Sequence, residues 1–180
     1  MSSHAEHVSG LVERVTFHSH GVGPSRAFRI CKVYGDDAIQ KVQEDPYRLA
    51  RDIWGIGFKT ADQIAASLGI DKQSHLRARA GVEYVLQALT EEGHCAYARH
   101  LLVEKTVGML EIDTPVVEQA IEHGLAEARL VSRPRPDGSA LIYLAPLDAC
   151  ERQLARNLVA LSRAPHPCPP VDAAKAAVWA

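Results

Sequence analysis

An internal repeat restricts the fold of this chain more than any other feature of its sequence. The stretch HGVGPSRAFRICKVYG (residues 20–35) aligns without gaps on WGIGFKTADQIAASLG (residues 54–69). The shared residues are both glycines of a Gly-x-Gly, one alanine, one isoleucine and a closing glycine. Because glycine tolerates the positive φ of tight turns and helix ends, each copy is expected to form a helix, a tight turn and a second helix.

The residues around each Gly-x-Gly support this interpretation. LVERVTFHS and PYRLARDI precede the two turns, and Asp45-Pro46 has the residue types of a helix start. After the second turn, one helical face collects the apolar residues Ala61, Ile64, Ala65 and Leu68. Gly35 and Gly69 are expected to cap the second helices, and the linking sequence YGDDAIQKVQED predicts a short helix from Asp37.

The sequence after the repeat predicts three helices followed by a β-hairpin. Residues 74–94 carry an apolar helical stripe with Ser74 as N-cap, and AYARHLLVEKTVGML is interpreted as a second helix. The third, DTPVVEQAIEHGLAEARL, is expected to begin with Thr114 as N-cap and Pro115 in the first turn. VSRPRPDGSALIYLA predicts a hairpin that turns at residues 136–138, with its better strand at 140–144. This order of elements is that of a winged-helix domain.

The two ends of the chain differ from its middle. Residues 1–10 are expected to be disordered, and they lack the basic start and apolar centre of a signal peptide. LDACERQLARNLVAL predicts a helix after Pro146, and SRAPHPCPPVD, with its four prolines, predicts a linker or extended arm. No apolar run approaches the roughly 18 residues that cross a bilayer, so we expect no membrane contact and a cytoplasmic location.

Composition excludes a broad basic surface but leaves room for a local one. The net charge is −2, whereas residues 24–34 hold Arg26, Arg29 and Lys32 without an acid. The spacing of the four cysteines fits no C-x-x-C site, so they are expected to be buried as small hydrophobic residues: Cys31, Cys95, Cys150 and Cys168. His18-Ser-His20 has no Cys or carboxylate partner at ligand spacing, so no metal site is predicted.

A Gly-x-Gly directly before a helix favours phosphate binding. The helix N-terminus presents unpaired N–H groups and a partial positive charge, and the glycines let an anion approach the backbone. Neither a Walker A loop nor a Rossmann G-x-G-x-x-G after a strand is present in the sequence. Two such turns in one register predict contacts with DNA phosphates. The alternative is that the glycines only form tight helical hairpins.

The GVG and GIG turns resemble the paired helix-hairpin-helix motifs of DNA repair and recombination proteins. A closer resemblance is to RecD-like (exodeoxyribonuclease V alpha subunit-like) ATP-dependent DNA helicases. It rests on YGDDAIQKVQEDPYRLARDIWGIGFKTADQIAASLGI, RARAGVEYVLQAL and GH, with Asp45 in place of the usual Asn. The resemblance implies the N-terminal accessory region of a bacterial enzyme that unwinds DNA 5′ to 3′ with ATP and magnesium. The motor motifs are not in these residues, so this chain is expected to bind DNA, to lack catalysis and to hold no cofactor.

The predicted architecture is therefore mainly α. A tandem helix-hairpin-helix module covers residues 11–72, and a winged-helix-like unit of three helices plus a β-hairpin covers 73–146. Residues 147–180 are expected to form a helix and a Pro-rich linker toward the motor domain, which together with single-stranded or forked DNA is the expected partner.

The resemblance also assigns phosphate contacts to both turns. Pro24 has no N–H to donate, so the first turn is expected to be the weaker contact. The assigned residues are Gly21, Val22, Gly23, Ser25 and Arg26 in the first copy and Gly55, Ile56, Gly57, Lys59 and Thr60 in the second. Further DNA contacts are possible at Arg77, Arg79, Arg133 and Arg135.

Three alternatives stay open at this point. GIGFKTA also resembles the hairpin of helix-hairpin-helix DNA glycosylases, in which Lys59 is the attacking amine, although the stretch that follows lacks the expected aspartate. The hairpins are otherwise a protein-interaction platform. Trp54, flanked by apolar residues, is expected to pack in the core, with base stacking as the alternative.

Overall fold

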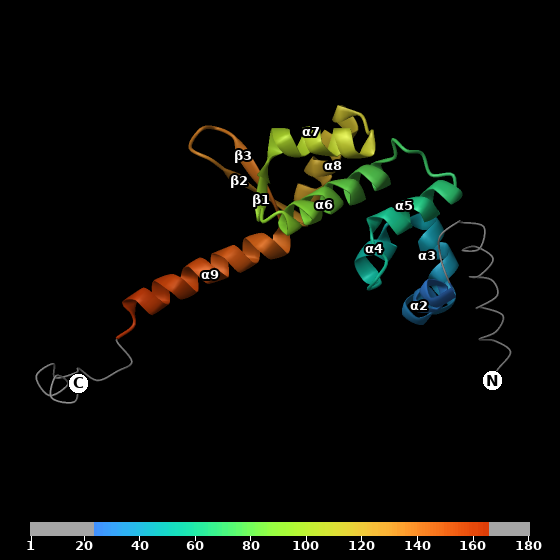
Figure 1. Cartoon of the computed structure of the whole chain (residues 1–180), viewed down its shortest axis with the longest axis horizontal. Coiled ribbons are helices and arrows are strands. Elements are labelled where there is room, and N and C mark those ends of the chain that lie inside the picture. Colours follow the sequence, from blue (N-terminus) through green and yellow to red (C-terminus); the bar gives the residue numbers. More distant parts are fainter. Residues whose placement is uncertain (1–23, 166–180) are drawn as a thin grey trace, which may run out of the picture. The chain divides into compact units, whose positions relative to one another are not determined.

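The computed structural model describes residues 24–165 (Figure 1). The first Gly-x-Gly (Gly21, Val22 and Gly23), the His18 and His20 pair, and Cys168 lie outside the described residues. So do the N-terminal segment and most of the Pro-rich linker.

All regular elements in the described part of the repeat are helices, joined by short turns. They comprise α2 (Pro24–Tyr34), the 3₁₀ helix η1 (Gly35–Asp37), α3 (Ala38–Glu44), α4 (Arg48–Asp52) and α5 (Phe58–Ser67). Repeat-related positions have the same environment: Ala27 and Ala61 are buried, and so are Ile30 and Ile64. The short helix predicted in the linking sequence is present as η1 and α3. The repeat in the sequence is therefore a repeat in the packing.

The predicted helix ends are formed by the expected residues. Gly35 and Gly69 follow α2 and α5 with φ of 60° and 77°, a left-handed conformation that glycine adopts without strain. At the end of α5, Ile70 N–H donates to Ala65 O at 3.0 Å, which closes a Schellman turn. The Asp45 carboxylate accepts from Tyr47 N–H at 3.0 Å, so Asp45 caps the turn that leads into α4, although α4 itself begins at Arg48.

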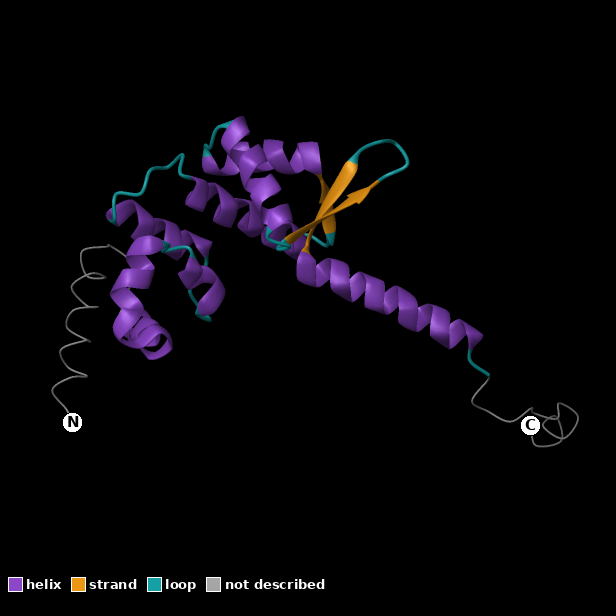
Figure 2. Cartoon of the chain, turned by 180° about the vertical axis from the view of Figure 1, so that it is seen from behind, coloured by secondary structure: helices purple, strands orange, loops and turns teal. Residues whose placement is uncertain are grey.

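The second half combines three helices with a small antiparallel sheet. Its elements are α6 (His75–Glu91), β1 (Ala96–Ala98), α7 (Arg99–Leu110), α8 (Thr114–Ala126), β2 (Leu130–Pro134) and β3 (Ala140–Leu144). The strand order is β1-β3-β2, and Figure 2 shows the strands grouped beside the helices. Ile142 at the centre of β3 pairs with Tyr97 on one side and Ser132 on the other. The fold is mainly α, as predicted, and the element order is that of a winged helix.

Two details of this half differ from the prediction. Residues 96–98 form β1 rather than the first turn of a helix, because they pair with β3 across the sheet. The N-cap of α8 is Asp113, one residue before the predicted Thr114. The strand predicted at residues 140–144 is present with those bounds.

Helix α5 belongs to two hydrophobic clusters. Its Ile64 side chain packs with α2, α3 and α4, while Ala61 and Ala65 pack with α6, α7 and α8. Phe58, at the start of α5, stacks between Tyr47 and Tyr84 with ring centroids 5.8 and 4.7 Å apart. This shared helix fixes the second Gly-x-Gly turn against the three-helix unit, and residues 24–145 pack as one compact unit.

Two expectations about burial are wrong. Trp54 does not pack in the core: its side chain is 91% exposed, although its neighbours Ile53 and Ile56 are buried. Cys95 and Cys150 are exposed and Cys31 is half-buried, so these cysteines are not the core residues that their apolar character predicts. In both cases the tertiary arrangement, and not residue type, decides burial.

Helix α9 (Ala145–Arg163) forms a second unit from Pro146 onward, in agreement with the helix predicted there. It has exposed apolar side chains at helical spacing: Leu154, Leu158, Val159 and Leu161. Among residues 24–165 no helix is both long enough and apolar enough to span a bilayer.

Candidate nucleic-acid interface

The second Gly-x-Gly turn leaves the N-terminus of α5 open to solvent. Gly55 has a φ of +82°, and the Ile56 side chain is buried beneath the turn. Ile56 N–H donates to Ile53 O at 3.1 Å, so this amide is used within the turn. Gly57 is extended, with φ −94° and ψ 174°, and is the N-cap of α5.

The first amides of α5 have no acceptor in the described part of the chain. Thr60 and Ala61 donate to Gly57 O at 3.1 Å, whereas the N–H groups of Phe58 and Lys59 precede the first helical hydrogen bonds. No side chain between residues 24 and 165 caps this end, and the first turn contains no acid. A Cβ built on Gly57 meets no atom within 4 Å. An anion therefore has both donors and space here.

The side chains of Lys59 and Thr60 follow these amides. Lys59 is exposed and makes no ion pair with any described residue, while Thr60 is partly exposed. A glycosylase-like role for Lys59 requires an acidic partner, and no described carboxylate pairs with its amine. Lys59 is thus a cation beside an open helix N-terminus.

Arg29 holds the turn from the other copy of the repeat. Its Nη1 donates to Trp54 O at 2.8 Å and its Nε to Ser25 O at 3.3 Å. A Cβ built on Gly55 lies 2.6 Å from Nη1, so glycine at this position serves both the positive φ and the approach of Arg29. The sequence shows Arg29 in a basic stretch but gives no sign of this role, because its partner is 25 residues away.

A second polar contact joins the copies. The Tyr34 hydroxyl on α2 donates to Asp52 Oδ2 on α4 at 2.8 Å. Burial, together with this hydrogen bond and the Asp52 charge, raises the pKa of Tyr34. The phenol therefore stays protonated and continues to donate.

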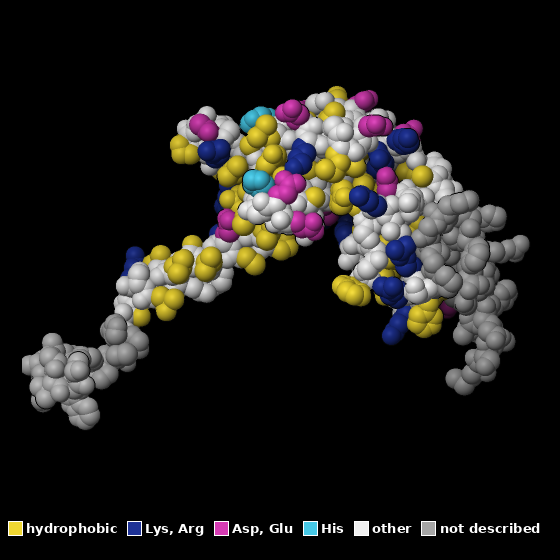
Figure 3. Space-filling model, viewed as in Figure 1, with side chains coloured by type: hydrophobic (Ala, Val, Ile, Leu, Met, Phe, Trp, Pro, Cys, Tyr) yellow, Lys and Arg dark blue, Asp and Glu magenta, His cyan; other side chains and the backbone are white. Residues whose placement is uncertain are grey.

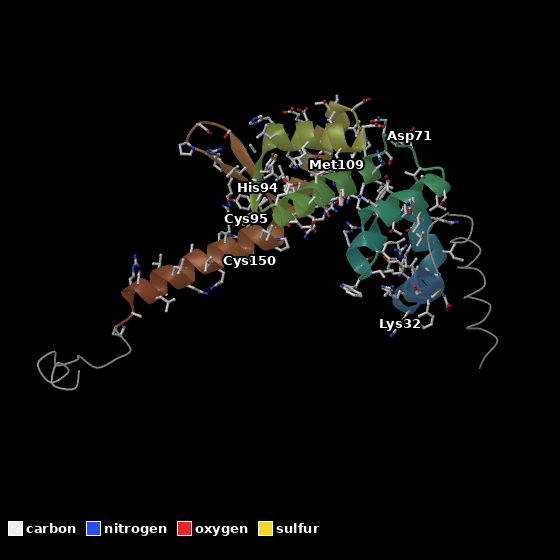
Figure 4. The ribbon with its side chains drawn as sticks, viewed as in Figure 1. Lys32, Asp71, His94, Cys95, Met109 and Cys150 are labelled. Carbon is white, nitrogen blue, oxygen red and sulfur yellow. The ribbon has the colours of Figure 1, made fainter. Side chains whose placement is uncertain are left out.

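The basic and hydroxyl residues of the first copy that the structure describes lie on α2. Ser25 is exposed, Arg26 is half-buried and Lys32 is exposed on α2, where Figure 4 labels it. In Figure 3 this region shows Lys and Arg side chains beside exposed hydrophobic ones. The exposed apolar residues of the repeat are Phe28, Val33 and Trp54.

Arg77 lies in a structural ion pair. Its Nε is 2.8 Å from Asp62 Oδ1, and Tyr47 donates to the same oxygen at 2.7 Å. Arg77 Nη1 donates to Leu110 O at 2.8 Å and to Lys72 O at 3.1 Å. The hydrogen bond with Asp62 raises the pKa of Arg77, against the opposing effect of burial. Its guanidinium joins α5, α6 and the end of α7, so we leave it out of the interface.

The other arginines that were predicted to contact DNA also make contacts within the protein. Arg79 pairs with Glu127 at 3.0 Å and lines a cavity of about 360 Å³ with Gly57 and Phe58. Arg135 pairs with Asp137 at 3.7 Å in the turn between β2 and β3, and Arg133, on β2, also makes contacts. The structure does not bring these three residues to the α5 N-terminus as a set.

Comparison with known proteins gives a family match that includes the second hairpin. Residues 13–96 match the family model described as the ATP-dependent RecD2 DNA helicase HHH domain, where HHH denotes helix-hairpin-helix. The chain is 29% identical over 182 residues to the ATP-dependent RecD2 DNA helicase of Deinococcus radiodurans. That alignment covers 95% of this chain and 25% of the relative, so the chain spans about a quarter of the relative's length. The segment 13–96 thus matches the helix-hairpin-helix domain described for the RecD2 DNA helicase family.

Proposed function

We propose that this chain binds DNA without sequence preference, through backbone phosphates at the N-terminus of α5. The observation that carries the proposal is an uncapped helix end inside a segment that matches the helix-hairpin-helix domain of a DNA helicase family, beside a lysine that pairs with no described residue. Amides and a cation at a helix N-terminus are suited to phosphate oxygens. Such contacts position DNA and carry no sequence information.

Each residue of the turn has a distinct role in this proposal. Gly55 and Gly57 keep the approach open, Lys59 supplies charge, and Thr60 supplies a hydroxyl donor. Ile56 acts through its buried side chain, which holds the turn, because its amide already donates to Ile53. The first copy adds a second phosphate contact through Gly21, Val22, Gly23, Ser25 and Arg26, weakened by Pro24.

We further propose that the whole protein is a cytoplasmic 5′-to-3′ DNA helicase in which this region is an N-terminal accessory part. The support is the curated relative, which is an ATP-dependent helicase. ATP and magnesium belong to the motor, since these 180 residues contain no Walker A sequence to hold them. The chain alone is then expected to bind DNA without hydrolysing ATP.

A protein-interaction platform is the second candidate. The observation in its favour is that two apolar side chains of the helix-hairpin-helix region, Phe28 and Val33, are 69% and 53% exposed. Salt separates the two functions, because phosphate binding weakens steeply as salt rises and an apolar contact does not.

The proposal is tested by reversing charge at the open helix end. Gly57→Glu with Lys59→Glu is expected to lower DNA affinity at least 100-fold, from a micromolar or weaker starting value, in fluorescence anisotropy at low salt. The variant is expected to fold, because the Gly57 Cβ position is empty and Lys59 is exposed. Gly108→Glu with Arg163→Glu makes the same change in net charge elsewhere and is the matched control. Unchanged binding by the first variant across a salt titration refutes phosphate binding at this turn.

A further inference from the structure

Trp54 is the most exposed of the large hydrophobic side chains in the described part of the chain. Its 91% exposure compares with 69% for Phe28 and 53% for Val33, the other exposed apolar residues of the repeat. A tryptophan side chain offers about 150–250 Å² of contact area, so leaving it in water forgoes a large stabilisation. An exposed aromatic at a binding turn therefore indicates a partner that covers the ring.

The backbone that carries this ring is held firmly on both sides. Ile53 and Ile56 are 3% and 2% exposed and anchor the turn in the hydrophobic cluster. Arg29 Nη1 donates to the Trp54 carbonyl at 2.8 Å, and Ile56 N–H donates to Ile53 O at 3.1 Å. The ring is thus presented to solvent from a fixed backbone, which lowers the entropic cost of stacking on it.

The surroundings of the ring identify the partner by its chemistry. Gly57, the N-cap of α5, is three residues away, so its Cα lies no more than about 11 Å from that of Trp54. The cation of Lys59 follows, and no acid lies between residues 53 and 61. A ligand that carries an anionic group and a flat π face within this span is a nucleotide. Aromatic platforms beside phosphate-binding groups are the usual architecture for single-stranded nucleic acid.

Base pairing decides which form of DNA can stack on the Trp54 ring. In a duplex the faces of the bases are stacked on their neighbours, whereas an unpaired base offers its face to a side chain. From this geometry we propose that Trp54 stacks on an unpaired nucleobase whose adjacent phosphate is bound at the α5 N-terminus. This rests on the proposed phosphate site and adds to it a residue, Trp54, that selects unpaired DNA: a single strand, or the unpaired segment of a fork or gap.

The test compares one variant on two DNA forms. Trp54→Ala in the 180-residue chain is expected to weaken binding of an oligo-dT strand about tenfold, while affinity for a blunt duplex stays within about twofold. Trp54→Phe, which keeps a ring, is expected to recover most of the loss. Met109→Ala removes another exposed apolar side chain and is the control.

Fluorescence supplies a direct readout of stacking. The sequence has two tryptophans, so Trp179→Phe leaves Trp54 as the sole indole. Its emission is expected to be quenched by oligo-dT and to change little with duplex. Equal affinity of Trp54→Ala and the parent chain for oligo-dT, or equal losses on both DNA forms, overturns the stacking proposal.

The outcomes also separate this inference from the proposed function. If the Gly57→Glu, Lys59→Glu variant loses DNA and Trp54→Ala binds normally, the phosphate site stands and stacking is wrong. If a protein quenches the Trp54 emission and oligo-dT does not, the nucleotide is refuted as the partner that covers the ring. If the parent chain binds neither DNA form at low salt, both proposals are wrong.

Discussion

Two exposed glycine turns among residues 24–165, the helical turn at Gly55 and the β-hairpin turn at Gly138, have basic residues nearby but differ in what their polar groups contact. Gly55 and Gly138 have almost the same φ, +82° and +81°. In the β-hairpin, Arg135 N–H donates to Ser139 O at 2.8 Å, and Asp137 accepts from Ser139 N–H at 2.9 Å. At the helical turn, the first amides of α5 have no described acceptor. Unsatisfied donors, rather than glycines or basic residues alone, distinguish a candidate anion site.

A similar contrast separates Lys59 from several cations of the three-helix unit and its sheet. Between α6 and β3 several cationic side chains are paired with acids, as in Arg79–Glu127, Arg99–Glu122, Lys105–Glu92, Arg129–Glu83 and Arg135–Asp137. Lys59 has no such pair within residues 24–165. The paired cations are therefore expected to act on the fold, and Lys59 is expected to act on a ligand.

The largest effect on stability is expected from substitution of Arg77, whose guanidinium donates to Asp62, Lys72 and Leu110. Arg77→Ala removes its two hydrogen bonds to Asp62 and leaves Leu110 O without its donor. Because the Arg77 side chain is only 12% exposed, we expect a loss of about 3 kcal/mol of unfolding free energy. Urea denaturation followed by circular dichroism measures it.

Lys59→Ala is the matched comparison for that experiment. Its side chain is exposed and makes no described contact, so its unfolding free energy is expected to change by less than about 0.5 kcal/mol. A similar loss for both variants means that pairing does not separate structural from ligand-binding cations in this domain.

A smaller effect on stability is expected from the titration of Tyr47, which donates to the same Asp62 carboxylate as Arg77. Burial and the hydrogen bond to Asp62 raise the pKa of Tyr47 above its ordinary value of about 10. The stability linked to the protonated phenol is fully present below about pH 10 and is lost as the pH rises toward the folded-state pKa. Tyr47→Phe is expected to cost about 1 kcal/mol at neutral pH and to flatten the alkaline decline.

Tyr34 is expected to contribute to the same alkaline decline, since its pKa is also raised, by burial and Asp52. A chain with both Tyr34→Phe and Tyr47→Phe is expected to show the flattest profile between about pH 9 and pH 11. An unchanged alkaline decline in that chain assigns the loss to other groups and contradicts the role of these phenols.

Much of the repeat could be predicted from the sequence because its signals are local. The helix-capping role of Gly69 depends on one residue with φ > 0, and the shared burial of Ile30 and Ile64 follows from helical spacing. The β3 strand was predicted with its observed bounds, since β-branched and aromatic residues follow a Pro-Asp-Gly turn.

The features that the sequence did not predict depend on distant partners. Strand β1 has three residues, too few to show alternation, and it exists because β3 pairs with it. The role of Arg77 depends on Asp62 and on Leu110, 33 residues further along the chain. Trp54 has the apolar neighbours of a core residue, yet only the folded turn shows that Ile53 and Ile56 point inward and the indole does not.

Salt dependence tests most directly whether the helical turn, and not the β-hairpin, binds the DNA phosphates as we propose. Affinities of the parent chain, Lys59→Gln and Arg135→Gln for one oligo-dT strand are measured from low to moderate salt. Loss of a single phosphate contact is expected to make the slope of log K against log salt shallower by about 0.7 for Lys59→Gln. Arg135→Gln is expected to keep the parent slope. An unchanged slope for Lys59→Gln with a shallower one for Arg135→Gln contradicts the claim.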